Sequence, residues 1–211
     1  MTFNLSETDR LLTTTRAVRK RLDFKRPVPR EVILDCLRVA IQAPSGGNTQ
    51  RWRWLVIDDS AARADIAALY RKRANPYLSG YGEPSGRAGL MVDSAKYLSD
   101  HLHEVPVFVI PCQLDRVPDQ ATNEMMAGFY GSILPAVWSF QLALHSRGLG
   151  SAFTTLHLAH EHEAAQRLGI PDTVTQAALL PVAYTTGADF KPAPRRPVEE
   201  ITYFNAWKQT G

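Results

Sequence analysis

Apolar residues recur at helical spacing between Pro29 and Gln42, and this segment predicts an amphipathic helix. Glu31 falls in the first turn of that helix, and Pro44 follows its end. Weaker helical patterns occupy residues 8–16, 61–70 and 161–171. Residues 123–148 are apolar on nearly all sides, which predicts one long buried helix that stops at Gly148.

Other segments have the pattern of strands, namely residues 51–59, 105–114, 149–156 and 176–187. The first alternates charged and apolar residues before an apolar triplet, and the second is apolar almost throughout. Helical segments separate these strands, and the order therefore predicts a sandwich of four or five strands with helices on both sides. We expect a single domain over residues 1–211.

Residues 71–91 are rich in Gly, Pro, Tyr and Arg, a composition typical of a loop or lid. We expect the lid at about residues 71–95 and a Pro-rich C-terminal extension at about residues 188–211. Within the lid, Tyr77 and Tyr81 are candidates for stacking on a substrate.

Composition narrows the class of protein. The formal charge of +3 over 211 residues is far below the clustered excess of a nucleic-acid binder, and 45% apolar residues are enough for a sizeable core. Cys36 and Cys112 lie far apart, which excludes a disulfide framework and favours a reducing compartment. The chain has neither a leader pattern nor an apolar run long enough to cross a bilayer. We expect a cytoplasmic protein that binds no membrane and no nucleic acid.

Two kinds of residue indicate an anionic, flat ligand. Arg16 and Arg19 are three residues apart at the end of a helical segment, and Arg195 lies among prolines; guanidinium groups suit phosphate and polarised carbonyl oxygens. The glycines after Pro44 leave backbone N–H groups open to such a ligand. The histidines at 157, 160 and 162 cross from a strand end into a helix without a cysteine, so we expect no metal. No dinucleotide fingerprint or P-loop occurs in the sequence.

Several segments, in order, resemble the signature segments of the FMN-dependent nitroreductase family. They are "TRAVRKR", "PVPREVILDCLRVAIQAPSGGNTQRWRW", "RGLGSAFTT", "RLGIPD", "LLPVAY" and "PRRPVEEI", and the match runs from about Thr15 to Trp207 without the lid. The resemblance implies an α+β fold, a three-layer α/β/α sandwich with a mixed central sheet. It also implies an intertwined homodimer with FMN at the subunit interface. In this family NADH or NADPH reduces the flavin, which then reduces a nitroaromatic, a quinone or a similar flat electrophile by a ping-pong mechanism.

The resemblance also implies which residues bind FMN: Arg16, Ala17, Arg19, Pro44, Ser45, Gly46, Asn48, Thr154, Thr155 and Arg195. Arg19 matches the residue that faces the flavin N1–C2=O edge, where a cation stabilises the reduced, anionic form. The segment from Pro44 to Asn48 matches the loop that covers the flavin from the partner subunit. Thr154 and Thr155 match the segment beside flavin N5, and Arg195 matches the arginine that binds the phosphate.

The N-terminal motif departs from the family pattern, because Thr15 and Ala17 stand where the family commonly has an arginine and a serine. This change places more of the phosphate binding on Arg16 and Arg195. We expect no catalytic side chain, since the cofactor carries the redox chemistry.

Three alternatives remain at the level of the sequence. The "APSGGNT" loop also resembles that of reductive dehalogenases and of the flavin-cleaving enzyme that makes dimethylbenzimidazole. An FMN-storing protein without turnover is a second alternative. A nucleic-acid module that stacks bases on Trp52 and Trp54 is the third, although the low net charge argues against it.

Overall fold

The computed structural model describes residues 2–209, which form two compact units. The main unit is Thr15–Ala188. The terminal unit combines the residues up to Thr14 with those from Asp189 onward, and it contains helix α1 (Leu5–Thr14) and a short 3-10 helix, Val198–Ile201. The C-terminal part of this unit begins where the sequence predicts the extension.

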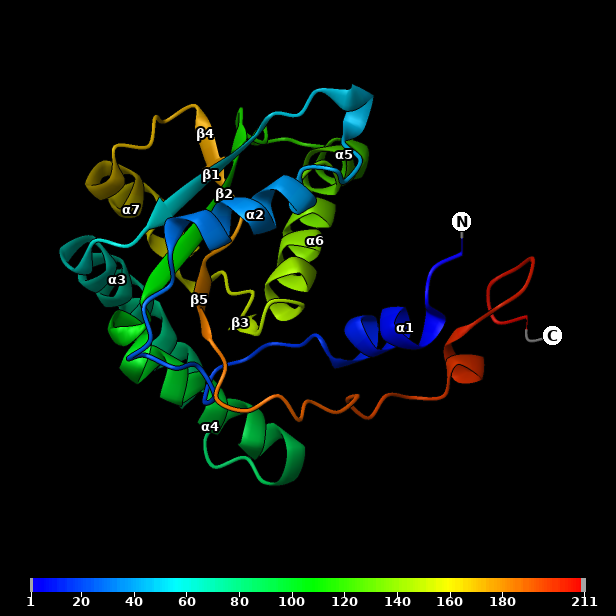
Figure 1. Ribbon diagram of the computed structural model, residues 1–211. Coiled ribbons are helices and arrows are strands. Elements are labelled where there is room, and N and C mark those ends of the chain that lie inside the picture. The colour runs from blue at the N-terminus through cyan, green and yellow to red at the C-terminus, as the bar shows by residue number, and fades with distance from the viewer. Residues whose placement is uncertain (1, 210–211) are drawn as a thin grey trace. The chain divides into compact units, whose positions relative to one another are not determined.

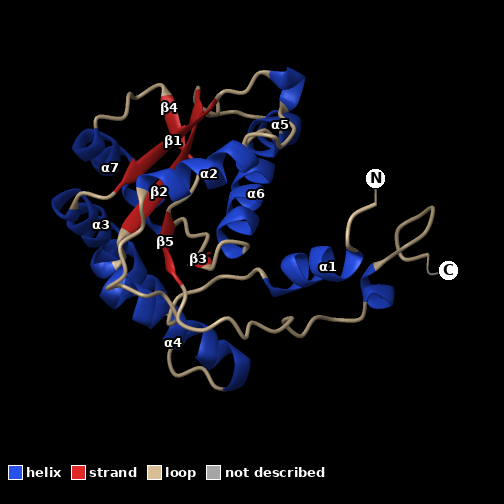
Figure 2. Ribbon diagram, in the orientation of Figure 1, coloured by secondary structure: helices blue, strands red, loops and turns tan. Residues whose placement is uncertain are grey.

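A five-stranded sheet lies at the centre of the main unit (Figures 1 and 2). Its strands are β1 (Trp52–Ile57), β2 (Val107–Leu114), β3 (Leu149–Ser151), β4 (Val174–Gln176) and β5 (Leu180–Tyr184). The order is β1-β2-β5-β3, and β4 pairs with the far end of β2. All these paired strands are antiparallel. Among the described residues, parallel pairing occurs only in the isolated bridges Ala17–Ser151 and Asp115–Val174, so the predicted mixed character is limited to these two contacts.

Helices cover both faces of the sheet, which confirms the predicted α/β/α layers (Figure 2). On one face, α2 (Arg30–Ala40) and α6 (Leu134–His145) pack in one hydrophobic cluster with Val107 and Val109. The other face carries α3 (Ser60–Ser79), α4 (Gly86–His101) and α7 (Glu161–Leu168). Side chains alternate across a strand, so β2 contributes apolar residues to both layers.

The predicted long helix over residues 123–148 is two helices, α5 (Asn123–Gly131) and α6. Pro135 stands in the first turn of α6. Proline has no N–H to donate, and its ring clashes with the carbonyl of the residue four positions earlier, so a continuous helix cannot pass through this position without a kink or break. The break leaves Ser132 at the junction between the two helices.

Residues 71–91, predicted to be a loop, are largely helical, because α3 continues to Ser79 and α4 begins at Gly86. Tyr70, Ala74 and Leu78 are buried at intervals of four residues, and this stripe holds the helix on the main unit despite Pro76. The glycines and prolines of the segment favour a loop, but the buried stripe decides its structure. We call α3 and α4, with residues 80–85 between them, the α3–α4 hairpin.

Two buried cysteines lie on opposite faces of the sheet. Cys36 of α2 belongs to the cluster with α6, whereas Cys112 lies three positions beyond Val109 on β2 and therefore faces the other layer. Burial raises the pKa of Cys36 to about 11 and that of Cys112 to about 12. Both thiols are free. Within residues 2–209, no helix is long and apolar enough to cross a membrane.

Candidate functional site

The segment that carries the first predicted arginines is attached to β3. Ala17 bridges Ser151, and the Val18 amide donates to the Ser151 carbonyl at 2.8 Å. Gly150 makes this close approach possible, because a Cβ there would lie 2.9 Å from Val18 Cβ. Arg16 and Ala17 are exposed, and Arg19 is half-buried with its Nη1 3.5 Å from Ser94 Oγ of α4.

Thr154 lies three residues beyond β3, the strand to which the segment of Ala17 is attached. Its backbone pairs with Leu179 through hydrogen bonds of 3.2 and 2.7 Å, and its hydroxyl donates to the Tyr70 hydroxyl at 3.1 Å. Burial raises the pKa of the Tyr70 phenol, while the Thr154 hydrogen bond and the Arg19 charge act in the opposite direction. Arg19, Tyr70 and Thr154 thus converge in one place. Thr155 is exposed and precedes the 3-10 helix Leu156–His160.

The predicted cradle loop lies elsewhere in the main unit. Gly46 donates its amide to Ser132 Oγ at 3.0 Å, and the Gln50 amide donates to Ser45 Oγ at 3.2 Å. Gly47, Asn48 and Gln50 have positive φ angles of 56°, 52° and 49°. These turns leave the loop from Pro44 to Asn48 largely exposed.

The length of α6 separates the loop from the Arg19 and Thr154 cluster. Gln141 donates to Ser151 Oγ at 3.0 Å, whereas the loop contacts Ser132, before the helix begins. Gln141 is seven residues beyond the first residue of α6, or about 10 Å along the axis. One copy of the chain therefore brings together only part of the predicted site.

The candidate substrate residues lie on the α3–α4 hairpin. Tyr77 and Tyr81 join hydroxyl to hydroxyl at 2.8 Å, and their rings are 5.5 Å apart at 79°. The Arg73 guanidinium lies 5.5 Å from the Tyr77 ring centroid. Tyr77 is two helical turns beyond Tyr70, on the same side of α3. The hairpin therefore extends from the Thr154 hydroxyl to the exposed tyrosines.

Arg195 belongs to the terminal unit, where it is exposed and donates to the neighbouring Pro194 carbonyl at 3.2 Å. Its contact with a phosphate stays a prediction. Sequence reasoning missed Tyr70 and Ser94, since nothing in the spacing of residues indicates that their hydroxyls meet Thr154 and Arg19.

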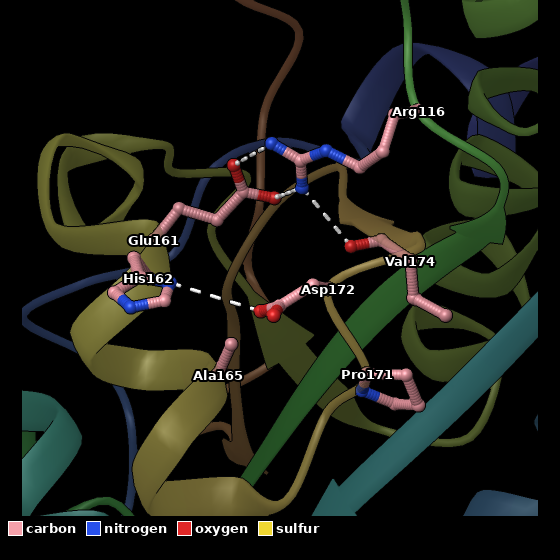
Figure 3. A pocket seen from close by; sticks show the side chains of 7 residues that line it. All are labelled: Arg116, Glu161, His162, Ala165, Pro171, Asp172 and Val174. Atoms are coloured by element: carbon pink, nitrogen blue, oxygen red, sulfur yellow. Dashed lines mark hydrogen bonds and ion pairs between the residues drawn. The ribbon is translucent and has the colours of Figure 1, made fainter.

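A pocket of about 250 Å³ lies away from these residues, beside α7 (Figure 3). Arg116 donates to both Glu161 oxygens, at 2.7 and 3.0 Å, and to the Val174 carbonyl. Burial would raise the pKa of Glu161, but the hydrogen bonds from Arg116 and from the Gln176 amide hold it below its ordinary value. These polar groups pair with one another and join α7 to β4, so we assign them a structural role.

Not all histidines of this region lie at the surface. His157 is fully buried, and burial lowers its pKa to about 4. His160 pairs with Glu163 at 2.8 Å, and His162 lies 3.7 Å from Asp172. In the part of the chain that the structure describes, no three His, Cys, Asp or Glu side chains are arranged to hold a metal ion.

The family model described as Nitroreductase family matches residues 12–184. Iodotyrosine deiodinase of Thermotoga neapolitana is 26% identical over 192 residues, which cover 90% of this chain and 93% of that protein.

Solved structures share the fold. Oxidized iodotyrosine deiodinase bound to FMN and 3-iodo-L-tyrosine is similar with a TM-score of 0.70 and 26% identity, covering 93% of this chain and 98% of that chain. The FMN-dependent nitroreductase NfnB of Mycobacterium smegmatis, in complex with NADPH, has a TM-score of 0.68 and 19% identity, covering 96% of this chain and 100% of that chain. At this identity the second likeness concerns the fold alone.

Proposed function

Because this chain belongs to the Nitroreductase family, we propose that it binds FMN and uses NADH or NADPH to reduce nitroaromatics, quinones or similar flat electrophiles. The observation that carries the proposal is that Arg19 and Thr154 both act on the Tyr70 hydroxyl, Thr154 through a hydrogen bond and Arg19 through its charge. A guanidinium can donate to the carbonyl edge of a flavin ring, and a hydroxyl can either donate to N5 or accept from N5–H at the other edge.

The donor set suits FMN in charge as well as in hydrogen bonding. Arg16 and Arg19 supply positive charge beside β3, and no carboxylate is paired with Arg19 among the ion pairs of residues 2–209. A fixed cation favours the form of the cofactor that carries negative charge. When bound, FMN would supply the transfer of reducing equivalents. Arg19 would hold the carbonyl edge and Thr154 the N5 edge.

We further propose that a second copy of the chain completes the site. The loop from Pro44 to Asn48 contacts Ser132, before α6 begins, whereas Ser151 of β3 contacts Gln141 farther along that helix, so the loop would cover the flavin of a partner. Exposed apolar side chains on α2 and α6 give such a partner a surface to bury. These side chains are Leu34, Val39, Leu134 and Trp138, which are 43%, 46%, 38% and 43% exposed.

A reductive dehalogenase is the second candidate function. Iodotyrosine deiodinases match this chain at 26% identity over most of both chains, as a sequence relative and as a solved structure. Both activities would use the same flavin edge. They would differ in which substrate the α3–α4 hairpin allows to reach the flavin. The exposed aromatic pair Tyr77 and Tyr81 is compatible with either aromatic substrate.

An anaerobic absorbance experiment on the purified protein tests the proposal. We expect a flavin band that bleaches with NADPH or NADH and returns on addition of a nitroaromatic or quinone. A band that bleaches only with dithionite and returns with 3-iodotyrosine would favour the dehalogenase. A band that never returns with any acceptor would favour FMN storage, and loss of the flavin itself would indicate flavin cleavage. Protein that stays colourless after incubation with FMN would contradict the proposal.

A further inference from the structure

Tyr70 of α3 is a buried hydroxyl within the candidate flavin site. Its side chain is only 3% exposed, so it does not reach the surface at which a ligand would bind. Its hydroxyl nevertheless accepts a hydrogen bond from Thr154 Oγ1 at 3.1 Å. A buried phenol oxygen that contacts one side chain of a site acts on a ligand through that side chain.

The direction of this hydrogen bond matters for the chemistry of N5. Oxidised FMN presents N5 as an acceptor, whereas reduced FMN presents N5–H as a donor. A threonine hydroxyl has one hydrogen and two lone pairs, so Thr154 can accept from N5–H when its own hydrogen points away from N5, and an acceptor on the other side favours that orientation. The Tyr70 oxygen is in that position, and Thr154 already donates to it.

We propose that Tyr70 is a positioning residue that turns the Thr154 hydroxyl so that it can accept a hydrogen bond from reduced FMN. The inference rests on the proposed function, which brings FMN to Thr154. Without Tyr70, the Thr154 hydrogen would have no protein acceptor when Thr154 accepts from N5–H, and a partly buried donor that a bound ring covers would then stay unsatisfied. Tyr70 thus favours the reduced over the oxidised cofactor.

The neighbouring helix of the hairpin has a parallel contact. Ser94 of α4 accepts from Arg19 Nη1 at 3.5 Å and donates to the Met91 carbonyl at 3.1 Å. Both flavin-facing residues, Arg19 and Thr154, therefore contact a hydroxyl of the α3–α4 hairpin. The hairpin that carries Tyr77 and Tyr81 also orients the edge at which FMN would be reduced.

The test is the midpoint potential of bound FMN in Tyr70→Phe, which removes one oxygen atom. We expect the ratio of reduced to oxidised FMN at a fixed solution potential to fall about five-fold, the effect of one net hydrogen bond. Tyr97→Phe is the matched control, because it removes a phenol oxygen from the same hairpin, where the ring stacks on Phe24 and contacts His101. Thermal unfolding of the FMN-free variants checks that each one folds.

A double-mutant cycle separates positioning from a general structural effect. In a Thr154→Val background, Tyr70→Phe should leave the potential where Thr154→Val alone puts it. In a Thr154→Ser background, which keeps the hydroxyl, Tyr70→Phe should lower the potential again. An unchanged potential in Tyr70→Phe, or a shift that persists in the Thr154→Val background, overturns the inference while the proposed function stands. A wild-type protein that binds no FMN removes both.

Discussion

The amide of Gly46 donates to the Ser132 hydroxyl across 3.0 Å, and the same hydroxyl donates to the Gly128 carbonyl at 2.7 Å. Through this chain of two hydrogen bonds, the loop from Pro44 to Asn48 is attached to the junction between α5 and α6. The break at Pro135 creates that junction. A helix boundary therefore sets the position of the loop that we propose covers the flavin of a partner subunit.

Ser132→Ala should loosen this loop and weaken FMN binding. Removal of one net hydrogen bond is worth about 1 kcal/mol, or about a five-fold rise in the dissociation constant of FMN. Fluorescence titration of FMN-free protein with FMN measures this constant. Ser146→Ala is the control, since Ser146 caps the other end of α6 by donating to the Ala143 carbonyl. Equal affinities in the two variants would contradict the role of Ser132.

Arg19→Ala should lower the midpoint potential of bound FMN. A charge-assisted hydrogen bond contributes about 1.5 kcal/mol, which corresponds to about 30 mV for a two-electron couple. Spectroelectrochemistry on the FMN-loaded protein measures the shift. Lys20→Ala removes an adjacent cation that pairs instead with Asp93, and it should leave the potential nearly unchanged. A potential that rises in Arg19→Ala would show that the guanidinium does not face the reduced ring.

Arg195→Ala should weaken FMN binding by about 2 kcal/mol through loss of a charge-assisted contact with the phosphate. Riboflavin lacks the phosphate, so the variant and the wild type should bind riboflavin with equal affinity. Arg196→Ala is the matched control, because it removes the same charge from the neighbouring residue. If riboflavin binding falls as much as FMN binding, Arg195 does not contact the phosphate.

His157 predicts a loss of stability on acidification. Burial holds its folded pKa at about 4, below the ordinary value of 6.5. Above pH 6.5 the His157 imidazole is neutral in both the folded and the unfolded protein, so its titration does not reduce the free energy of unfolding. Between pH 6.5 and 4 the unfolded chain binds a proton that folded His157 excludes. The free energy of unfolding therefore decreases by about 1 kcal/mol for each unit by which the pH is lowered.

Urea unfolding at pH 5 to 8 measures this dependence. His157→Gln should flatten the slope between pH 5 and 6.5, whereas His103→Gln, at an exposed position, should keep it. A slope that survives in His157→Gln would assign the dependence to other groups.

Gly150→Ala should destabilise the main unit by about 2 kcal/mol, because a Cβ at this position collides with Val18 and Thr185. Gly128→Ala, in α5, meets no atom within 4 Å and should be neutral or slightly stabilising. Thermal denaturation compares the two. Equal stabilities would mean that the segment from Ala17 to Arg19 moves away from β3 without cost.

Much of the fold could be predicted because it depends on local pattern. The spacing in residues 29–42 predicts α2, and the apolar run before Leu114 predicts β2. The hairpin could not be read from composition, since its glycines and prolines indicate a loop while the buried stripe of Tyr70, Ala74 and Leu78 makes a helix. β4 has only three residues, too few for a pattern.

For the site, the resemblance predicts which residues belong to it but not which other residues support them. Arg19 and Thr154 follow from the resemblance, and the structure brings them to one edge. Tyr70 is 84 positions from Thr154, and a contact at that separation depends on how α3 packs on the sheet. The distance of the loop from Thr154 likewise follows from the course of α6, which spacing along the chain does not reveal.

The two buried cysteines give the protein a built-in reporter on each side of its sheet. Cys36 and Cys112 are closed to solvent in the folded state, and their raised pKa values keep the thiols protonated at neutral pH. A thiol reagent therefore reacts only with molecules that have opened, and the rates at the two positions report the opening of the α2 and α6 layer separately from that of the α3 layer. The local opening of each helical layer can thus be followed in the native sequence without an engineered label.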